Sequence, residues 1–128
     1  MKTKKEVILT TEAPKPIGPY SQAIRAGGFL FCSGQIALDP QSGQVTSTDV
    51  EGQTKRVMEN AKAVLHAAGM TFENVVKCTI FLKSMGDFPK VNEIYAQYFS
   101  GTPPARSTVE VARLPKDVLV EVECIAAE

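Results

Sequence analysis

An arginine stands directly behind two prolines in the stretch "PPARSTVEV", residues 103–111. The prolines restrict the backbone and the alternation after them predicts a strand, so the Arg106 guanidinium would leave a rigid piece of chain. Its planar fork could hold a carboxylate through two parallel hydrogen bonds, which a lysine could not reproduce. The alternative, a structural ion pair, is the commoner role of an isolated arginine.

Two glutamates near the end of the chain have the strand parity that we expect for Arg106. If the strands at 103–115 and 117–127 pair, Glu121 or Glu123 would lie near the guanidinium. A carboxylate beside a bound anion and an apolar wall could have a raised pKa and serve as a general base. The alternative is a solvated salt bridge.

Two shorter motifs and a single histidine are further candidates. Tyr20 follows a Gly-Pro turn in "IGPYSQA", where its phenol could reach a ligand or only seal the edge of the domain. Ser33 and Gly34 belong to "CSGQI", in which the glycine can let backbone N–H groups approach a ligand, although such a run can also be a plain strand end. His66, the single histidine, is expected to face solvent or to pack locally, and without a second imidazole a multi-histidine metal site is excluded.

The composition restricts the function further. Cys32, Cys78 and Cys124 are widely spaced and form no CxxC pair, which indicates reduced thiols and neither a disulfide framework nor a zinc knuckle. Fourteen Lys and Arg balance fourteen Asp and Glu, so no overall field attracts a nucleic acid or an anionic membrane. The apolar piece "VILT" is too short for a signal peptide or a membrane span. We therefore expect a cytoplasmic protein without a metal, nucleic-acid or membrane partner.

The whole chain, residues 1–128, is predicted to form one domain because it has no interior linker, repeat or low-complexity tract. A two-residue hairpin turn is predicted at Gly27 and Gly28. The predicted strands are residues 6–10, 20–27, 29–36, 74–84, 103–115 and 117–127.

Two segments have helical periodicity. The first begins with a capping box formed by Thr48 and Glu51 and stops at Gly69. The second has Asp87 as its N-cap and Gly101 after its end. The order of the elements predicts an α+β fold, one sheet with both helices on one face.

Strand parity predicts two different faces of that sheet. Val76, Cys78, Ile80 and Leu82 share one side of their strand and, with Val118, Val120, Val122 and Cys124, suit the helix-covered face. The other face mixes large apolar groups with charges, namely Phe29, Phe31, Val75, Phe81, Leu119 and Ile125 with Lys77, Arg106, Glu110, Glu121 and Glu123. A subunit interface with ionic pockets would fit this mixture. An open amphipathic sheet is the alternative, and a β-bulge would reset the parity.

Five motifs in order, "GPYSQA", "FCSGQI", "NAKAVLHAAG", "PPARSTVEVARLP" and "VEVECIA", resemble the Rid family of reactive intermediate deaminases, also called the YjgF or endoribonuclease L-PSP family. The likeness runs over residues 6–127 and is strongest to the RidA subfamily, the 2-iminobutanoate/2-iminopropanoate deaminases. It implies a chorismate-mutase-like mixed sheet. It also implies a homotrimer whose three sheets form a central barrel with ligand clefts between adjacent subunits.

The resemblance also implies an activity, the cofactor-free and metal-free hydrolysis of short 2-imino or enamine acids to 2-oxo acids and ammonia, which protects pyridoxal-phosphate enzymes. Arg106 matches the family's substrate-carboxylate anchor, and Glu121 matches the acid that orients the attacking water together with the backbone carbonyl of Thr108. The cleft-lining positions match Tyr20, Ser33, Gly34 and Asn92. Many bacterial members have cysteine in place of Thr108, so any thiol-dependent regulation there is in doubt, whereas activity should survive.

Two other functions stay open. A trimeric regulatory module could bind a 2-oxo acid or a related carboxylate in the same cleft without turnover, and Glu121 would then have no catalytic role. A ribonuclease or translation inhibitor is disfavoured by the zero net charge and the single histidine, because phosphate contacts supply much of the affinity for RNA.

Overall fold

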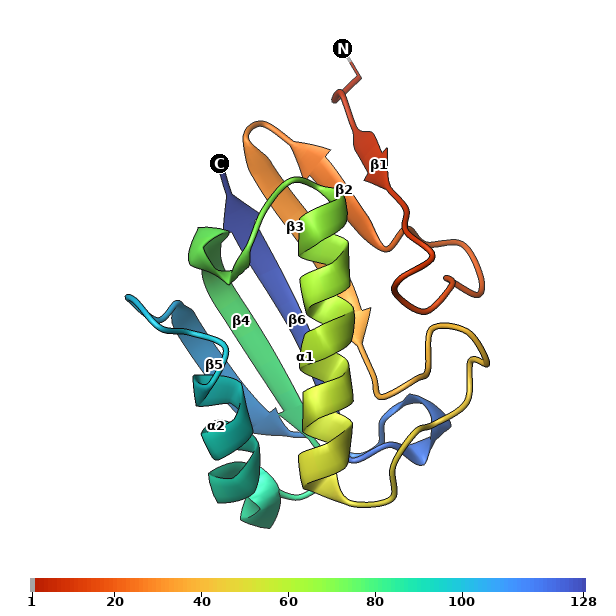
Figure 1. The fold of residues 1–128 in the computed structure, drawn as a ribbon, viewed down its shortest axis with the longest axis vertical. Helices are drawn as coiled ribbons and strands as arrows, with labels where there is room; N and C mark the ends of the chain where they lie inside the picture. Colours follow the sequence, from red (N-terminus) through yellow and green to blue (C-terminus); the bar gives the residue numbers. More distant parts are fainter. Residues whose placement is uncertain (1) are drawn as a thin grey trace.

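The alternating apolar segments form six strands in the computed structural model, which describes residues 2–128. They make one mixed sheet, and both helices lie in front of it in Figure 1. The strands are β1 (Glu6–Ile8), β2 (Ala23–Ala26), β3 (Phe29–Gln35), β4 (Val75–Leu82), β5 (Ala105–Glu110) and β6 (Val120–Ala127). Their order across the sheet is β1-β2-β3-β6-β4-β5. The predicted α+β class with two helices on one face is confirmed.

Local sequence signals explain the hairpin and most of the first helix. Gly27 and Gly28 both have positive φ, 57° and 81°, and join β2 to β3 as predicted. Helix α1 (Val50–Ala67) is followed by Gly69, whose φ of 76° confirms the predicted stop. The predicted capping box at 48 and 51 is wrong. The N-cap is Asp49, whose carboxylate accepts a hydrogen bond of 2.6 Å from the Gly52 amide.

Helix α2 (Phe88–Ala96) follows a 3₁₀ turn at Met85–Asp87. Asp87 occupies the predicted N-cap position, but its backbone is already helical and its side chain makes no capping hydrogen bond. The turn before the helix is instead held by a residue of the sheet, because the Met85 amide donates to the Glu110 carboxylate over 2.8 Å. The start of α2 is thereby fixed to the end of β5.

The strand pairing differs from the prediction at one point that affects the site. Strand β6 is antiparallel to both β3 and β4, while β5 runs parallel to β4 at the edge of the sheet. The predicted pairing of the last two strands is therefore wrong, because β4 lies between them. The chain goes from β4 through α2 to β5, and such a crossover places consecutive strands parallel and adjacent.

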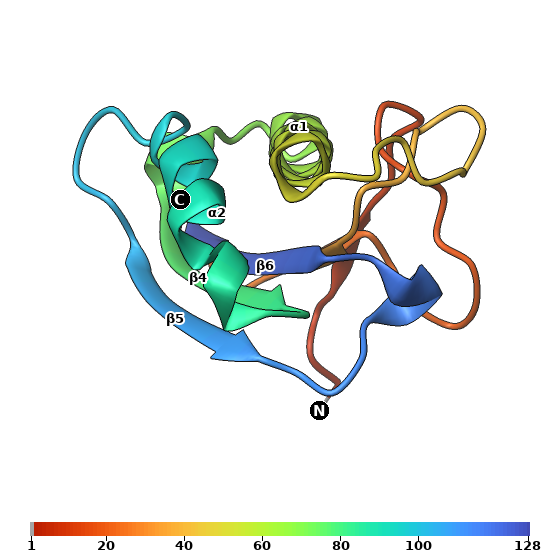
Figure 2. The same cartoon turned by 90° about the horizontal axis from the view of Figure 1, so that it is seen from below.

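The two helices cover one face of the sheet, as Figure 2 shows from below. Cys78, Ile80 and Leu82 of β4 are buried beneath them. Close to the start of the strand the predicted parity is reversed, since Val75 is 5% exposed and Val76 is 46% exposed. A register shift between Val75 and Lys77 causes the reversal, which is the effect of a β-bulge. No helix of the described residues covers the other face.

Arg106 lies on the helix side of the sheet, which contradicts its predicted place on the mixed face. In the register of β4 and β5, Arg106 is opposite Cys78, and Glu110 is opposite Leu82. Paired residues share a face, so both charged side chains point toward the helix layer. The prediction failed because a one-residue change of register moves every side chain of a strand to the other face.

The three cysteines lie in one row across the sheet, with Cys32 opposite Cys124 and Cys124 opposite Cys78. All are free thiols, two of them buried and Cys32 packed against the core, as predicted. Burial raises the pKa of Cys78 to about 11. The thiol is therefore protonated at neutral pH and behaves as a small apolar group.

Candidate functional site

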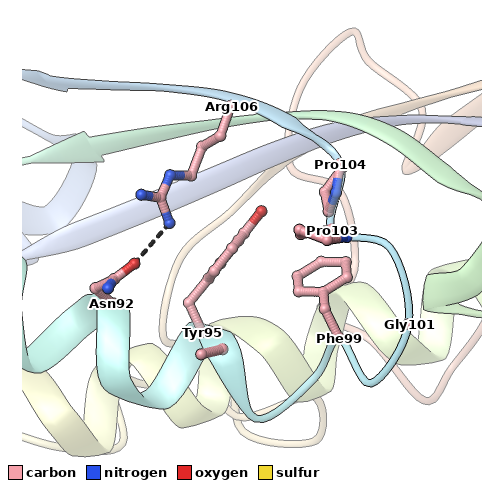
Figure 3. A pocket seen from close by; sticks show the side chains of 8 residues that line it. Asn92, Tyr95, Phe99, Gly101, Pro103, Pro104 and Arg106 are labelled. Carbon is pink, nitrogen blue, oxygen red and sulfur yellow. Dashed lines mark hydrogen bonds between the residues drawn. The ribbon is translucent and has the colours of Figure 1, made fainter.

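The Arg106 side chain lines a cavity of about 460 Å³ between α2, residues 97–104 and the start of β5 (Figure 3). Its Nη1 donates a 2.7 Å hydrogen bond to Oδ1 of Asn92. Its Cζ lies 5.1 Å from the ring centroids of both Phe88 and Tyr95. These distances are within the range of cation–π attraction, so α2 holds the guanidinium by an amide and two aromatic rings.

Two hydroxyl groups on the helix side of the sheet are buried and have no hydrogen-bond partner among residues 2–128, those of Tyr95 and Thr108. Tyr95 reaches from α2 toward β5 and is only 4% exposed. Burial, followed by the neighbouring Cys78 thiol, raises the pKa of this phenol, which therefore stays protonated. Thr108 is two residues beyond Arg106 on the same side of β5.

A second cavity, of about 710 Å³, lies elsewhere on the molecule. It is lined by four of the predicted site residues, Tyr20, Ser33, Gly34 and Glu121. The Glu121 carboxylate packs so closely on the Gly34 backbone that a Cβ at position 34 would collide with its Oε2. Gly34 is therefore required by the close approach of a carboxylate, a reason that the sequence did not reveal.

Glu121 is half-buried, and its electrostatic surroundings disfavour the charged form. Among residues 2–128, no lysine or arginine forms an ion pair with it. Desolvation, followed by repulsion from Glu123, raises the pKa of this carboxyl above its ordinary value. A carboxylate with a raised pKa at the wall of a cavity has the property that a general base needs.

Ser33 and Tyr20, the remaining two predicted residues of this cavity, differ in how free their side chains are to contact a ligand. The Ser33 hydroxyl donates a 2.6 Å hydrogen bond to the Ser21 carbonyl, so its proton is engaged in joining β3 to the segment before β2. Tyr20 is 53% exposed, at the rim. The rim itself is held by the buried Gln22, whose amide accepts from the Thr10 amide over 2.7 Å and donates to the Pro14 carbonyl over 2.9 Å.

The structure thus gathers the predicted residues into two sets. Arg106, Asn92 and Thr108 lie together on the helix side, and the other four line the larger cavity. Arg106 shares its rung of the ladder with buried Cys78, whereas Glu121 is paired with Phe81 on the opposite face. One copy of the chain therefore does not bring its arginine and its glutamate to the same ligand.

Sequence reasoning missed several residues of both cavities. Phe88 and Tyr95 are spaced with Asn92 on one face of α2, a signal that could have grouped them. Lys116, at the wall of the larger cavity, gave no such signal. The backbone of Lys116 is left-handed, with φ of 55°. The next residue in the same turn, Asp117, accepts hydrogen bonds of 2.6 and 3.0 Å from Arg113.

His66 is exposed on α1, in agreement with the prediction, and lines neither of the two cavities. In the part of the chain that the structure describes, no group of three or more His, Cys, Asp or Glu side chains is arranged to hold a metal ion. Within residues 2–128, no helix has the length and hydropathy to cross a bilayer.

Residues 10–128 match the family model of endoribonuclease L-PSP. A RutC family protein of Pyrococcus horikoshii is 59% identical over 122 residues, covering 95% of this chain and 97% of the relative. The 2-iminobutanoate/2-iminopropanoate deaminase of the mouse is 48% identical over 124 residues, covering 97% of this chain and 92% of the relative. The crystal structure of E. coli TdcF with bound serine superposes with a TM-score of 0.92 at 44% identity, covering 96% of this chain and 98% of that one.

Proposed function

Because the chain belongs to the endoribonuclease L-PSP family, also known as the Rid or YjgF family, we propose that it hydrolyses short 2-imino acids to 2-oxo acids and ammonia. The observation that carries this proposal is the Glu121 carboxylate at the wall of a cavity. It is half-buried, has a raised pKa and forms no ion pair with residues 2–128. The mouse relative, named for deamination of 2-iminobutanoate and 2-iminopropanoate, supports the choice of substrate. In the cytoplasm, such an activity would protect pyridoxal-phosphate enzymes from the imines.

The chemistry needs few groups because an iminium carbon is already electrophilic. Arg106 holds the substrate carboxylate through its planar fork, and the Thr108 backbone carbonyl and Glu121 accept hydrogen bonds from one water. As the water oxygen bonds to the imine carbon, Glu121 takes a proton from the water and the C=N electron pair moves to nitrogen. Glu121 then gives this proton to the nitrogen of the carbinolamine. As the C–N bond breaks and ammonia leaves, the hydroxyl group loses its proton to Glu121 and becomes the carbonyl of the 2-oxo acid, and Glu121 passes the proton to ammonia or solvent.

A complete site in this mechanism needs two copies of the chain. Arg106 and Glu121 belong to separate cavities and to opposite faces of one sheet, so we propose that adjacent subunits of a homotrimer contribute one each. The uncovered face supports an assembly through the sheets, because Phe29 and Phe31 are 45% and 46% exposed there. Large exposed apolar groups at one place commonly mark an interface.

The direct test is the lifetime of 2-iminobutanoate generated in the cuvette by a serine/threonine dehydratase from threonine. The wild-type protein should shorten this lifetime, and Arg106→Ala should not, while circular dichroism shows both proteins folded. If the wild-type protein leaves the lifetime of the imine unchanged where a mouse deaminase control shortens it, the proposed activity is wrong.

A carboxylate-binding module is the second candidate, favoured by the serine bound in the TdcF structure. Arg106 could serve either function, so Glu121→Gln separates them. For the deaminase, this substitution should abolish hydrolysis while 2-oxobutanoate still binds. For a binding module, the wild-type protein should bind 2-oxobutanoate without shortening the lifetime of the imine.

A further inference from the structure

Three side chains of α2 surround the Arg106 guanidinium, and we call Phe88, Asn92 and Tyr95 the α2 cradle. Asn92 accepts the 2.7 Å hydrogen bond from Nη1, and each aromatic centroid is 5.1 Å from Cζ. The residues are four and three positions apart, which places them on one face of the helix. Arg106 itself is exposed, so these contacts, and not burial, define where its charge lies.

The hydrogen bond to Asn92 selects which edge of the guanidinium remains free. It engages Nη1, and among residues 2–128 neither Nε nor Nη2 has a hydrogen-bond partner. Nε and Nη2 donate side by side from one edge of the planar group, the geometry that binds both oxygens of a carboxylate. The amide therefore leaves the bidentate edge of Arg106 available.

The two rings restrict the rotation that an amide alone would permit. A single hydrogen bond to Nη1 allows the plane of the guanidinium to turn about it. Aromatic faces attract a cation through their quadrupole, and a planar guanidinium is able to stack on such faces. The Tyr95 hydroxyl takes no part, because it has no partner among the described residues. Its ring carries the effect.

We propose that Phe88 and Tyr95 are positioning residues that orient Arg106 so that its Nε/Nη2 edge faces the ligand carboxylate. The proposal rests on the proposed function, since it deepens the role of Arg106 as the carboxylate anchor. It assigns the task to the aromatic faces of the two side chains. Loss of a ring should weaken the binding of any small carboxylate, and loss of the tyrosine hydroxyl should not.

The test compares ring-deleting with ring-preserving variants at half-buried Phe88. Phe88→Leu and Phe88→Met both remove the aromatic face, and their different shapes provide a second variant if one does not fold. Phe88→Tyr keeps the face. Tyr95→Phe is the matched control for the hydroxyl. The readouts are calorimetric binding of 2-oxobutanoate, KM and kcat for 2-iminobutanoate, and the ¹H–¹⁵N resonance of Arg106 Nε, assigned by its loss in Arg106→Lys.

Phe88→Leu and Phe88→Met should weaken 2-oxobutanoate binding and raise KM by roughly fivefold to tenfold, with kcat nearly unchanged. They should also move the Nε resonance, because the ring current of Phe88 is lost. Phe88→Tyr and Tyr95→Phe, which keep both aromatic faces, should retain most of the 2-oxobutanoate affinity that the two ring-deleting variants lose.

Folded Phe88→Leu and Phe88→Met with wild-type affinity for 2-oxobutanoate would overturn the proposal, whatever the Nε resonance does, because loss of the ring current moves that resonance in any case. Wild-type failure to bind 2-oxobutanoate would overturn it as well. If the wild type binds 2-oxobutanoate but hydrolyses no imine, the proposed function fails, and weaker binding by the two ring-deleting variants still supports the cradle.

Discussion

The carboxylate of Glu121 lies against the backbone of Gly34, with Cδ of the glutamate 2.9 Å from the place that a Cβ of residue 34 would occupy. Two strands produce this contact, β3 with its glycine and β6 with its glutamate. The position of the proposed base is therefore set by the absence of a side chain on the neighbouring strand.

Gly34→Ala should displace Glu121 without unfolding the protein. The atoms that a methyl group would strike belong to the end of a flexible side chain, and Gly34 is not in the left-handed region. A shift of about 1 Å in a catalytic group can cost roughly a hundredfold in rate, so kcat for 2-iminobutanoate should fall by about that factor. Gly86→Ala, which meets only the Ser84 Oγ at 3.4 Å, is the control. Unchanged kcat in Gly34→Ala would contradict this role of the glycine.

The pH dependence of activity should report the raised pKa of Glu121. Because the base must be ionised, kcat should fall as the pH drops through this pKa, and Glu121→Gln should lose roughly a hundredfold or more at all pH values. Glu123→Gln removes the repelling charge, so it should lower the pKa of Glu121 and move the acidic limb of the profile to lower pH. A limb unmoved in Glu123→Gln would show that another group controls it.

The raised pKa of Glu121 also affects the stability of the fold. A carboxyl whose pKa is raised by folding destabilises the folded state above that pKa, and this effect disappears as the pH falls below the pKa of the unfolded chain. Glu121→Gln should therefore be more stable than the wild type at pH 8, with the difference shrinking toward pH 4. Urea denaturation at both pH values measures it, and a difference independent of pH would contradict the assignment.

Arg25 should be the charged residue whose loss destabilises the fold clearly. Its side chain bonds Glu6 at 3.2 Å, Glu128 at 3.0 Å and the carbonyl of Ala68 at the end of α1, and it is 22% exposed. Arg25→Ala should lower the free energy of unfolding by about 1–3 kcal/mol. Arg113→Ala, which breaks an exposed pair with Asp117, should leave it almost unchanged. Equal effects in urea denaturation would contradict this difference.

Much of the fold could be predicted because its signals are local. The glycine pair at 27 and 28 and the stop at Gly69 each depend on a few neighbouring residues, and the structure confirms both. The face of Arg106 could not be predicted in this way. It depends on the register of β5 against β4, which the crossover through α2 sets and no residue near position 106 reveals.

In the candidate site too, contacts between neighbouring elements could be predicted and contacts between distant residues could not. Arg106 and Asn92 lie together because consecutive elements, α2 and β5, bring them together, and Ser33 and Gly34 are adjacent in sequence. The contact between Gly34 and Glu121 joins residues 87 positions apart through the shifted register of β3 and β6 near Gln35. Sequence spacing carries no information about that contact. The split into two cavities likewise appears only in the three-dimensional structure.

Thr108 distinguishes the use of a backbone carbonyl from the use of a side chain. Its Oγ1 is buried without a partner among residues 2–128, so replacing it by the methyl group of valine removes an unsatisfied polar atom. Thr108→Val should change the free energy of unfolding by less than about 1 kcal/mol and leave kcat within about twofold, because the carbonyl remains. Thr108→Ser, which keeps the hydroxyl, is the control. A large loss of kcat in Thr108→Val but not in Thr108→Ser would show that the hydroxyl group takes part in catalysis.

The shared site of the proposed trimer can be tested by mixing two inactive variants. Arg106→Ala retains an intact Glu121, and Glu121→Gln retains an intact Arg106, so some interfaces of a mixed ring would combine the two intact halves. In a closed ring, each interface joins two different patches, and random mixing in equal amounts should restore about a quarter of the wild-type kcat. The variants are unfolded together in urea, refolded together and assayed with 2-iminobutanoate, and each variant refolded alone is the control. Recovery near zero, with native mass spectrometry showing mixed trimers, would mean that both residues act within one subunit.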